Sequence, residues 1–268
     1  MKSDKVYMDI LLSPIKQSIY YLPKFGQGGK NGLSLEDFQK LYQGDIFYTW
    51  LGLDSPLMYA AHRVAGGMTS IYRQIGKGSE NLFRAILQDE LELSSQQVHW
   101  SYIIEMDNSS RRKLSLDGRI VFKDVLDKVK RSRIQNWVRN MGRMLQIEAK
   151  ILSCLQGVVF EVRQGYKSKD SKRQNADIAN ASKAYTQAYL PCVMVMSNQI
   201  DIDIVHRYRL NNWAILTGDI YGSHETSIYT FMKEIIGYDL AGFFQRNTDE
   251  LKNEVAKVLL SLLSINQE

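Results

Sequence analysis

Cysteine and histidine are scarce in this chain, so few residues are present that could form disulfide bonds or bind zinc. Its 268 residues include two cysteines, Cys154 and Cys192, and four histidines that lie far apart in the sequence. Both cysteines sit among apolar residues, so we interpret them as packed thiols and not as part of a disulfide framework. No two histidines have the spacing of metal ligands, and a zinc site is therefore not indicated.

Long apolar runs are also missing. No segment approaches the roughly 20 apolar residues that cross a bilayer. The first residues carry charges at Lys2, Asp4 and Lys5 and lack the apolar stretch of a secretory leader. We therefore expect a soluble, cytoplasmic protein with no membrane partner. A net charge of +5 is a mild excess that favours a polyanionic partner without specifying one.

The length and the hydrophobic content of 44% suffice for one sizeable core. We expect one domain over 1–268, with an N-terminal arm and loop at 1–55, a core at 75–220 and closing helices at 221–268. Within the arm, Ser34 is placed to cap a short helix whose first turn carries Glu36 and Asp37.

The hydrophobic pattern changes its period along the chain. Helical spacing begins at Pro56 and is expected to end at Gly66-Gly67, with a second helix over 79–93. A hairpin of strands 98–106 and 111–121 is expected next, followed by helical spacing over 122–155. Strands near 158–162, 191–197 and 213–218 then alternate with helices. This alternation predicts an α/β fold with a mixed central β-sheet flanked by helices.

The most informative stretch runs from Gly157 to Lys169. Glu161 interrupts the apolar run Val-Val-Phe-x-Val, and a cluster of cations follows it. A carboxylate in such a run is costly unless something binds it. Asp117 has a similar setting, because it ends a strand-like run and precedes Arg119.

Two carboxylates on adjacent strands repel each other, and a divalent cation relieves that repulsion. Hard oxygen ligands suit Mg²⁺, which takes one or two carboxylates and leaves its other positions to water and phosphate. Such an ion acidifies water for attack on phosphorus and stabilises charge on the phosphate oxygens. Ordinary structural roles remain open: Asp117-Gly118 is a common turn dipeptide, and Glu161 and Arg163 share a strand face on which they can pair.

The order of these features resembles a known group. A helix with Glu80, a hairpin ending near Asp117, a strand with Glu161-Val162-Arg163, a helix and a strand are similar to the PD-(D/E)xK nuclease superfamily. Within it, the chain most resembles type II restriction endonucleases, over about 75–220. The resemblance implies a restriction-endonuclease-like core and a Mg²⁺-dependent, sequence-specific endonuclease that hydrolyses phosphodiester bonds in double-stranded DNA.

The resemblance also implies roles for single residues. Asp117 matches the metal-binding acid and Glu161 the second acid, with Glu80 as a further acid beside the metal. Arg163 stands where the family usually has a catalytic lysine, and arginine does not exchange a proton near neutral pH. Either Arg163 is an electrostatic clamp, or Lys167 or Lys169 takes the lysine's part, or the nuclease is weakened. In some restriction enzymes one acid moves to the following helix, and Asp177 could fill that position here.

Two basic segments are candidates for DNA contact. The first follows the acidic strand and combines cations with side chains able to hydrogen-bond phosphate or base edges: Lys169, Lys172, Arg173, Gln174 and Asn175. The second contains Arg131 and Arg133 on an expected amphipathic helix. A charge run is usually a solvated face, and a membrane-surface helix has the same pattern as the second segment.

We thus expect a homodimer that matches a palindromic site, with no small-molecule cofactor besides the metal. Two alternatives stay open. One is a repair or recombination nuclease of the same fold that reads DNA structure. The other is a DNA-binding module of that fold which has lost turnover.

Overall fold

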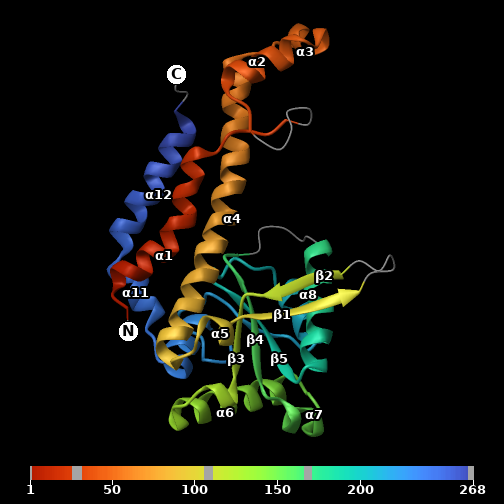
Figure 1. The fold of residues 1–268 in the computed structure, drawn as a ribbon, viewed down its shortest axis with the longest axis vertical. Coiled ribbons are helices and arrows are strands. Elements are labelled where there is room, and N and C mark those ends of the chain that lie inside the picture. The colour runs from red at the N-terminus through yellow and green to blue at the C-terminus, as the bar shows by residue number, and fades with distance from the viewer. Residues whose placement is uncertain (1, 26–31, 106–110, 166–170, 265–268) are drawn as a thin grey trace. The chain divides into compact units, whose positions relative to one another are not determined.

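A computed structural model describes residues 2–25, 32–105, 111–165 and 171–264 (Figure 1). The chain divides into two compact units. The first consists of Met1–Tyr7 and Ser79–Arg246, and the second of Met8–Gly78 and Asn247–Glu268. These bounds differ from those expected from sequence, since the C-terminal helices are shared between the two units. In the described part of the chain, no helix has the length and apolar character needed to cross a membrane.

The first unit is built on a four-stranded mixed sheet in the order β3-β4-β5-β6. Its strands are β3 (Gly118–Val121), β4 (Gly157–Arg163), β5 (Tyr189–Val195) and β6 (Ala214–Leu216). β3 is antiparallel to β4, whereas β4, β5 and β6 are parallel. α8 (Ser171–Thr186) and α9 (Ile202–Leu210) connect the parallel strands. The strand and helix alternation expected after residue 157 is therefore confirmed.

Helices cover both faces of this sheet. On one face, Phe160 of β4 packs against Phe83 of α4 (Pro56–Leu91) and Phe231 of α10 (Ile228–Phe231), with ring centroids 5.1 and 6.0 Å apart. On the other face, Val159 and Val193 join one core with Ala181 of α8 and residues of α9. The expectation of an α/β fold with a mixed sheet between helices is confirmed.

The remaining elements of the first unit surround the sheet. They are α5 (Ser95–Val98), a 3₁₀ turn η2 (Phe122–Asp124), α6 (Lys128–Met144), α7 (Ala149–Cys154), a π-turn η3 (Met232–Ile236) and α11 (Leu240–Arg246). The helical spacing expected over 122–155 therefore corresponds to η2, α6 and α7 and not to one continuous helix. Asp127 begins α6 by accepting hydrogen bonds from the N–H groups of Val129 and Lys130, and the chain turns at Gln146, where φ is 57°.

The expected second hairpin strand is also divided. β1 (Trp100–Glu105) pairs with β2 (Arg111–Leu116) in a separate two-stranded ribbon, whereas β3 joins the main sheet. The change of sheet occurs at Asp117, whose backbone N–H donates to the carbonyl of Phe160 over 2.8 Å. Hence the residue singled out from sequence stands where the chain passes from one sheet to the other.

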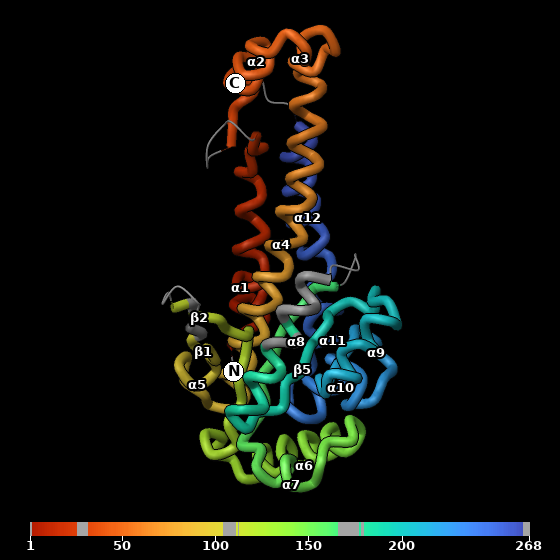
Figure 2. The backbone as a smooth tube through the Cα atoms, turned by 90° about the vertical axis from the view of Figure 1, so that its right-hand side faces the viewer, coloured from red at the N-terminus to blue at the C-terminus, as the bar shows by residue number. Residues whose placement is uncertain are grey.

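The second unit is helical. Its long elements are the C-terminal part of α1 (Asp4–Lys16), the N-terminal part of α4 and α12 (Thr248–Leu263), which run side by side (Figures 1 and 2). The short η1 (Gln17–Tyr20) follows α1, and α2 (Leu35–Gln43) and α3 (Ile46–Trp50) precede α4. The Ser34 hydroxyl accepts a hydrogen bond from the N–H of Asp37, which confirms the expected cap.

α4 continues through Gly66-Gly67, where sequence placed a helix end. The reason is packing, because these glycines lie where another segment comes close. A Cβ on Gly67 would stand 2.7 Å from a methyl of Leu262 in α12, and one on Gly66 would meet the hydroxyl of Tyr21. The missing side chains therefore permit close approach and do not stop the helix.

Candidate active site

Asp117 is fixed by the backbone of β4. Besides the N–H contact with Phe160, its carboxylate oxygen Oδ2 accepts a hydrogen bond from the N–H of Val162 over 2.8 Å. Its carbonyl accepts from Nη1 of Arg84 in α4 over 3.0 Å. Main chain and side chain are both held, so the carboxylate has little freedom to turn away from the sheet.

Glu161 lies next to the point where Asp117 binds β4. The β3–β4 ladder ends at the pair of Gly118 and Phe160, and Asp117 hydrogen-bonds β4 at both neighbours of Glu161, the carbonyl of Phe160 and the N–H of Val162. The charges of the two acids act on each other. The structure therefore brings together two acids that are 44 residues apart in sequence.

Both acids are held in surroundings that favour the neutral form. Burial, followed by the charge of Glu80, raises the pKa of Asp117 to about 6, against the opposing effects of the Val162 N–H, Arg163 and Arg84. Burial, then the charge of Asp117, raises the pKa of Glu161 well above its usual range despite the nearby Arg163. A cation bound between the two carboxylates would reverse this effect.

Arg163 is clamped by acids on two elements. Its Nη2 atom is 2.7 Å from Oε1 of Glu161 and 2.9 Å from Oδ1 of Asp177 in α8. Asp177 also accepts a hydrogen bond from the hydroxyl of Tyr208 in α9. All four side chains are buried. Arg163 is therefore an internal cation that links the acidic strand to the covering helices.

The structure adds residues that sequence did not identify. Arg84 lies one helical turn after Glu80 on α4, a spacing that puts both on the same face. Tyr208 is buried with Ile204 and Val205 on α9. A basic residue one helical turn after Glu80 is a signal that could have pointed to Arg84. No sequence signal distinguishes Tyr208 from other buried tyrosines.

The donor set suits one hard cation held by two carboxylates. Mg²⁺ usually takes one or two protein carboxylates and keeps several waters. Asp117 and Glu161 provide that number. Among the described residues no group of three or more His, Cys, Asp or Glu side chains is arranged to hold a metal. The fit accordingly depends on the pair, with Glu80 acting on both through its charge.

The expected DNA-contacting residues fall into three groups. Lys169 lies outside the described residues, as does Lys167, the candidate for the catalytic lysine. The other residues of the first segment form the beginning of α8, the helix that leaves the carboxyl end of β4: Lys172, Arg173, Gln174 and Asn175. The start of that helix is thus connected to Arg163 by a short segment.

Arg131 and Arg133 on α6 are not brought to the acids. Arg131 lines a cavity of about 330 Å³ together with Val121 and Gln156, which precedes the first residue of β4. Glu161 and Arg163 are near the other end of that strand, about 20 Å away at the usual rise per residue. Arg133 lies beside Gly237. A DNA contact by α6 would therefore be separate from the acid pair.

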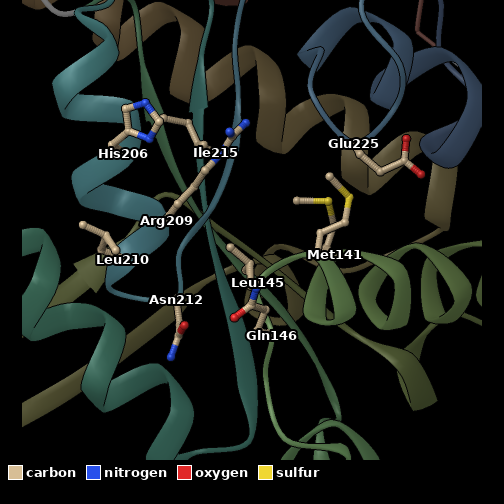
Figure 3. Close-up of a pocket in the computed structure, with 10 residues that line it drawn as sticks. Met141, Leu145, Gln146, His206, Arg209, Leu210, Asn212, Ile215 and Glu225 are labelled. Carbon is tan, nitrogen blue, oxygen red and sulfur yellow. The ribbon is translucent and has the colours of Figure 1, made fainter.

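Another cavity is also distinct from the acids. It measures about 470 Å³ and lies between the end of α6, α9 and β6. Figure 3 shows His206, Arg209 and Leu210 from α9 on one side of it, and Met141 and Leu145 on the other. None of its lining residues belongs to the acid cluster.

No known family model, curated protein or solved structure was found to match this chain. The functional argument therefore rests on the geometry of these residues.

Proposed function

We propose that this protein is a Mg²⁺-dependent endonuclease that hydrolyses phosphodiester bonds at a specific sequence in double-stranded DNA, in the manner of a type II restriction enzyme. The observation that supports this most is the placement of Asp117 beside Glu161, through hydrogen bonds to both neighbours of Glu161 on β4, with both pKa values raised. Neighbouring buried like charges are typical of a site that binds a cation or performs acid–base chemistry.

Asp117 and Glu161 would hold the ion. A bound Mg²⁺ would supply Lewis-acid chemistry, stabilising charge on the phosphate and activating water. The two backbone contacts of Asp117 hold the residue and its carboxylate against β4. Arg163 pairs with Glu161, but it is not assigned proton transfer because a guanidinium does not exchange its proton near neutral pH.

The position of α8 supports a phosphate-binding role beside these acids. Its first residues include Lys172 and Arg173, and a helix N-terminus favours anions. A backbone phosphate bound there would lie near the carboxyl end of β4. Restriction-endonuclease-like architecture is part of the same proposal, and the sheet with one antiparallel and three parallel strands is compatible with it.

Cleavage of plasmid DNA tests the proposal. We expect the purified protein to give discrete fragments with Mg²⁺, and Asp117→Asn and Glu161→Gln each to lower the rate by at least about 100-fold, a typical cost of losing one charge-stabilising group. DNA affinity measured with Ca²⁺ should change little. Glu36→Gln, which removes an exposed acid paired with Lys40, is the matched control and should cleave normally. Undiminished cleavage by either site variant would remove that acid from the mechanism.

One observation favours a second candidate. Arg163 occupies the usual lysine position and is bound by two carboxylates, so the chain could be a DNA-binding module of the same fold without turnover. Such a protein would bind DNA with Ca²⁺ and never cut with Mg²⁺ or Mn²⁺. The cleavage products distinguish a repair nuclease from a sequence-specific one, because nicking that follows DNA structure gives no discrete plasmid fragments.

A further inference from the structure

The second unit carries an exposed apolar surface around α3, which we call the α3 patch. It consists of large side chains on α3 and the turn that leads into α4: Ile46, Phe47, Tyr48, Trp50, Leu51 and Leu57. Their exposed fractions range from 36% for Tyr48 to 78% for Leu57. α2 and α3 lie at the N-terminal end of α4 (Figure 1). Single exposed apolar residues are common, but six within twelve positions are a concentration of exposed apolar surface that needs a reason.

The patch is held in a defined conformation. Tyr48 stacks on Tyr42 of α2, with ring centroids 4.8 Å apart, and Tyr42 packs at 4.3 Å against Phe38, which is fully buried. The carboxylate of Asp45 accepts a hydrogen bond from the N–H of Phe47 and caps α3. A surface that is already ordered loses less conformational entropy when a partner binds.

The charge of this segment does not favour a polyanionic partner. Between Leu41 and His62 the chain has no lysine or arginine, and its charged residues are Asp45 and Asp54. Binding to nucleic acid or to an anionic membrane depends on Lys and Arg side chains near the phosphates. A nearly uncharged aromatic surface suits a protein partner, and in a two-fold interface it avoids placing like charges opposite each other.

The area of the patch matches half of a dimer interface. If each large side chain presents about 150–250 Å² when fully exposed, these fractions amount to roughly 700 Å². The largest apolar patch on a typical monomer is about 300–600 Å², and a standard interface buries about 800 Å² per partner. We propose that the α3 patch binds the α3 patch of a second copy of this chain, forming a homodimer.

The proposed nuclease function explains what a dimer would be for, and only this explanation rests on the proposed function. Each chain holds one Asp117–Glu161 pair in its described residues, and a duplex has two strands to cut. A second copy would supply the second acid pair. The dimer itself is argued from area and charge, so it is tested without DNA, metal or cleavage.

Trp50 provides a direct probe in the unmodified protein. Of the four tryptophans, Trp50 is 75% exposed, whereas Trp100, Trp137 and Trp213 are buried. Acrylamide quenching of tryptophan fluorescence should therefore report mainly on Trp50. We expect quenching to decrease as the protein is concentrated from about 0.1 to 100 μM, a range that spans ordinary dimer affinities. The Trp50→Phe variant should show no such change.

Analytical ultracentrifugation gives the second readout. We expect the wild-type chain to sediment at twice its mass of 30.9 kDa, and Phe47→Gln and Trp50→Gln each to shift it towards 30.9 kDa with an unchanged circular dichroism spectrum. Tyr221→Gln, which replaces a side chain that is 92% exposed outside the patch, is the matched control and should stay dimeric.

A wild-type monomer at 100 μM, or patch variants that remain dimeric, would overturn the proposal. Binding of the monomeric wild-type chain to neutral phosphatidylcholine vesicles would instead assign the patch to a lipid surface and overturn it as well. A dimer that forms equally in Asp117→Asn, whether or not DNA is cut, would support the proposal independently of the nuclease function.

Discussion

At the scale of single residues, the acid pair is a source of instability that the fold retains. Burying a carboxylate costs free energy unless it is paired or bound, and burial is the largest contribution to the raised pKa of both Asp117 and Glu161. Arg163 offsets part of this cost for Glu161, and Asp177 holds Arg163 in place. Residues that reduce stability in this way are more often kept for function than for packing.

Removing the charge of Asp117 should stabilise the protein in the absence of metal. Since the pKa of Asp117 is about 6 when folded and 3.8 in the reference state, the folded chain binds more protons between these values, and stability falls as pH rises through them. We expect Asp117→Asn to raise the free energy of unfolding by about 1–3 kcal/mol above pH 7 and by little near pH 4. The amide oxygen can still accept from Val162.

Urea denaturation of both proteins across this pH range measures the effect. A gain that is the same at pH 4 and pH 7.5 would show that charge is not its cause. A loss of stability at pH 7.5 would contradict the burial argument.

At the scale of elements, α4 shows how glycine in a helix can serve packing. A Cβ on Gly78 would stand 2.2 Å from the carbonyl oxygen of Leu11 in α1, a backbone atom that cannot move without shifting the helix. A Cβ on Gly76 would meet nothing within 4 Å. The two glycines are two residues apart in one helix and have opposite surroundings.

This contrast gives a matched pair of substitutions. We expect Gly76→Ala to stabilise the protein by about 0.5–1 kcal/mol, the usual preference for alanine inside a helix. Gly78→Ala should destabilise it by about 1–3 kcal/mol despite the same preference, because it overpacks the contact with α1. Thermal unfolding of the two variants measures both effects. Equal shifts would mean that α1 does not approach α4 closely at Gly78.

At the scale of the whole molecule, metal binding and stability are linked. A ligand that binds only the folded chain stabilises it by an amount set by the ratio of its concentration to its dissociation constant. If Asp117 and Glu161 hold Mg²⁺ as proposed, the stability of the chain depends on the ion. The acids must be ionised to bind it, and with the pKa of Asp117 at about 6 this dependence should grow as pH rises through 6.

We expect Mg²⁺ at ten times its dissociation constant to raise the free energy of unfolding by about 1.4 kcal/mol at pH 7.5. EDTA should reverse the gain. Asp117→Asn and Glu161→Gln should show little or none of it, while Glu36→Gln should behave as wild type. Calorimetry at several Mg²⁺ concentrations tests this, and an equal gain in the site variants would place metal binding elsewhere.

Local patterns were enough to predict much of the fold. The Ser34 cap and the strands and helices after residue 157 follow from the spacing of apolar residues and from capping chemistry. The continuity of α4 did not follow, because the meaning of Gly66-Gly67 depends on Tyr21 and Leu262, which are distant in sequence. The division of 111–121 between two sheets did not follow either, because it is decided by hydrogen bonds from Asp117 to β4.

For the candidate site, sequence identified the side chains and tertiary structure decided their relations. An acid within an apolar run is visible in the sequence, since its cost comes from its immediate neighbours; Asp117 and Glu161 were found in this way. That Asp117 lies beside Glu161 is set by its hydrogen bonds to β4, and that Arg163 meets Asp177, which Tyr208 also binds, is set by how α8 and α9 cover the sheet. Register and packing join residues that are distant along the chain, so only the folded structure determines which charges meet.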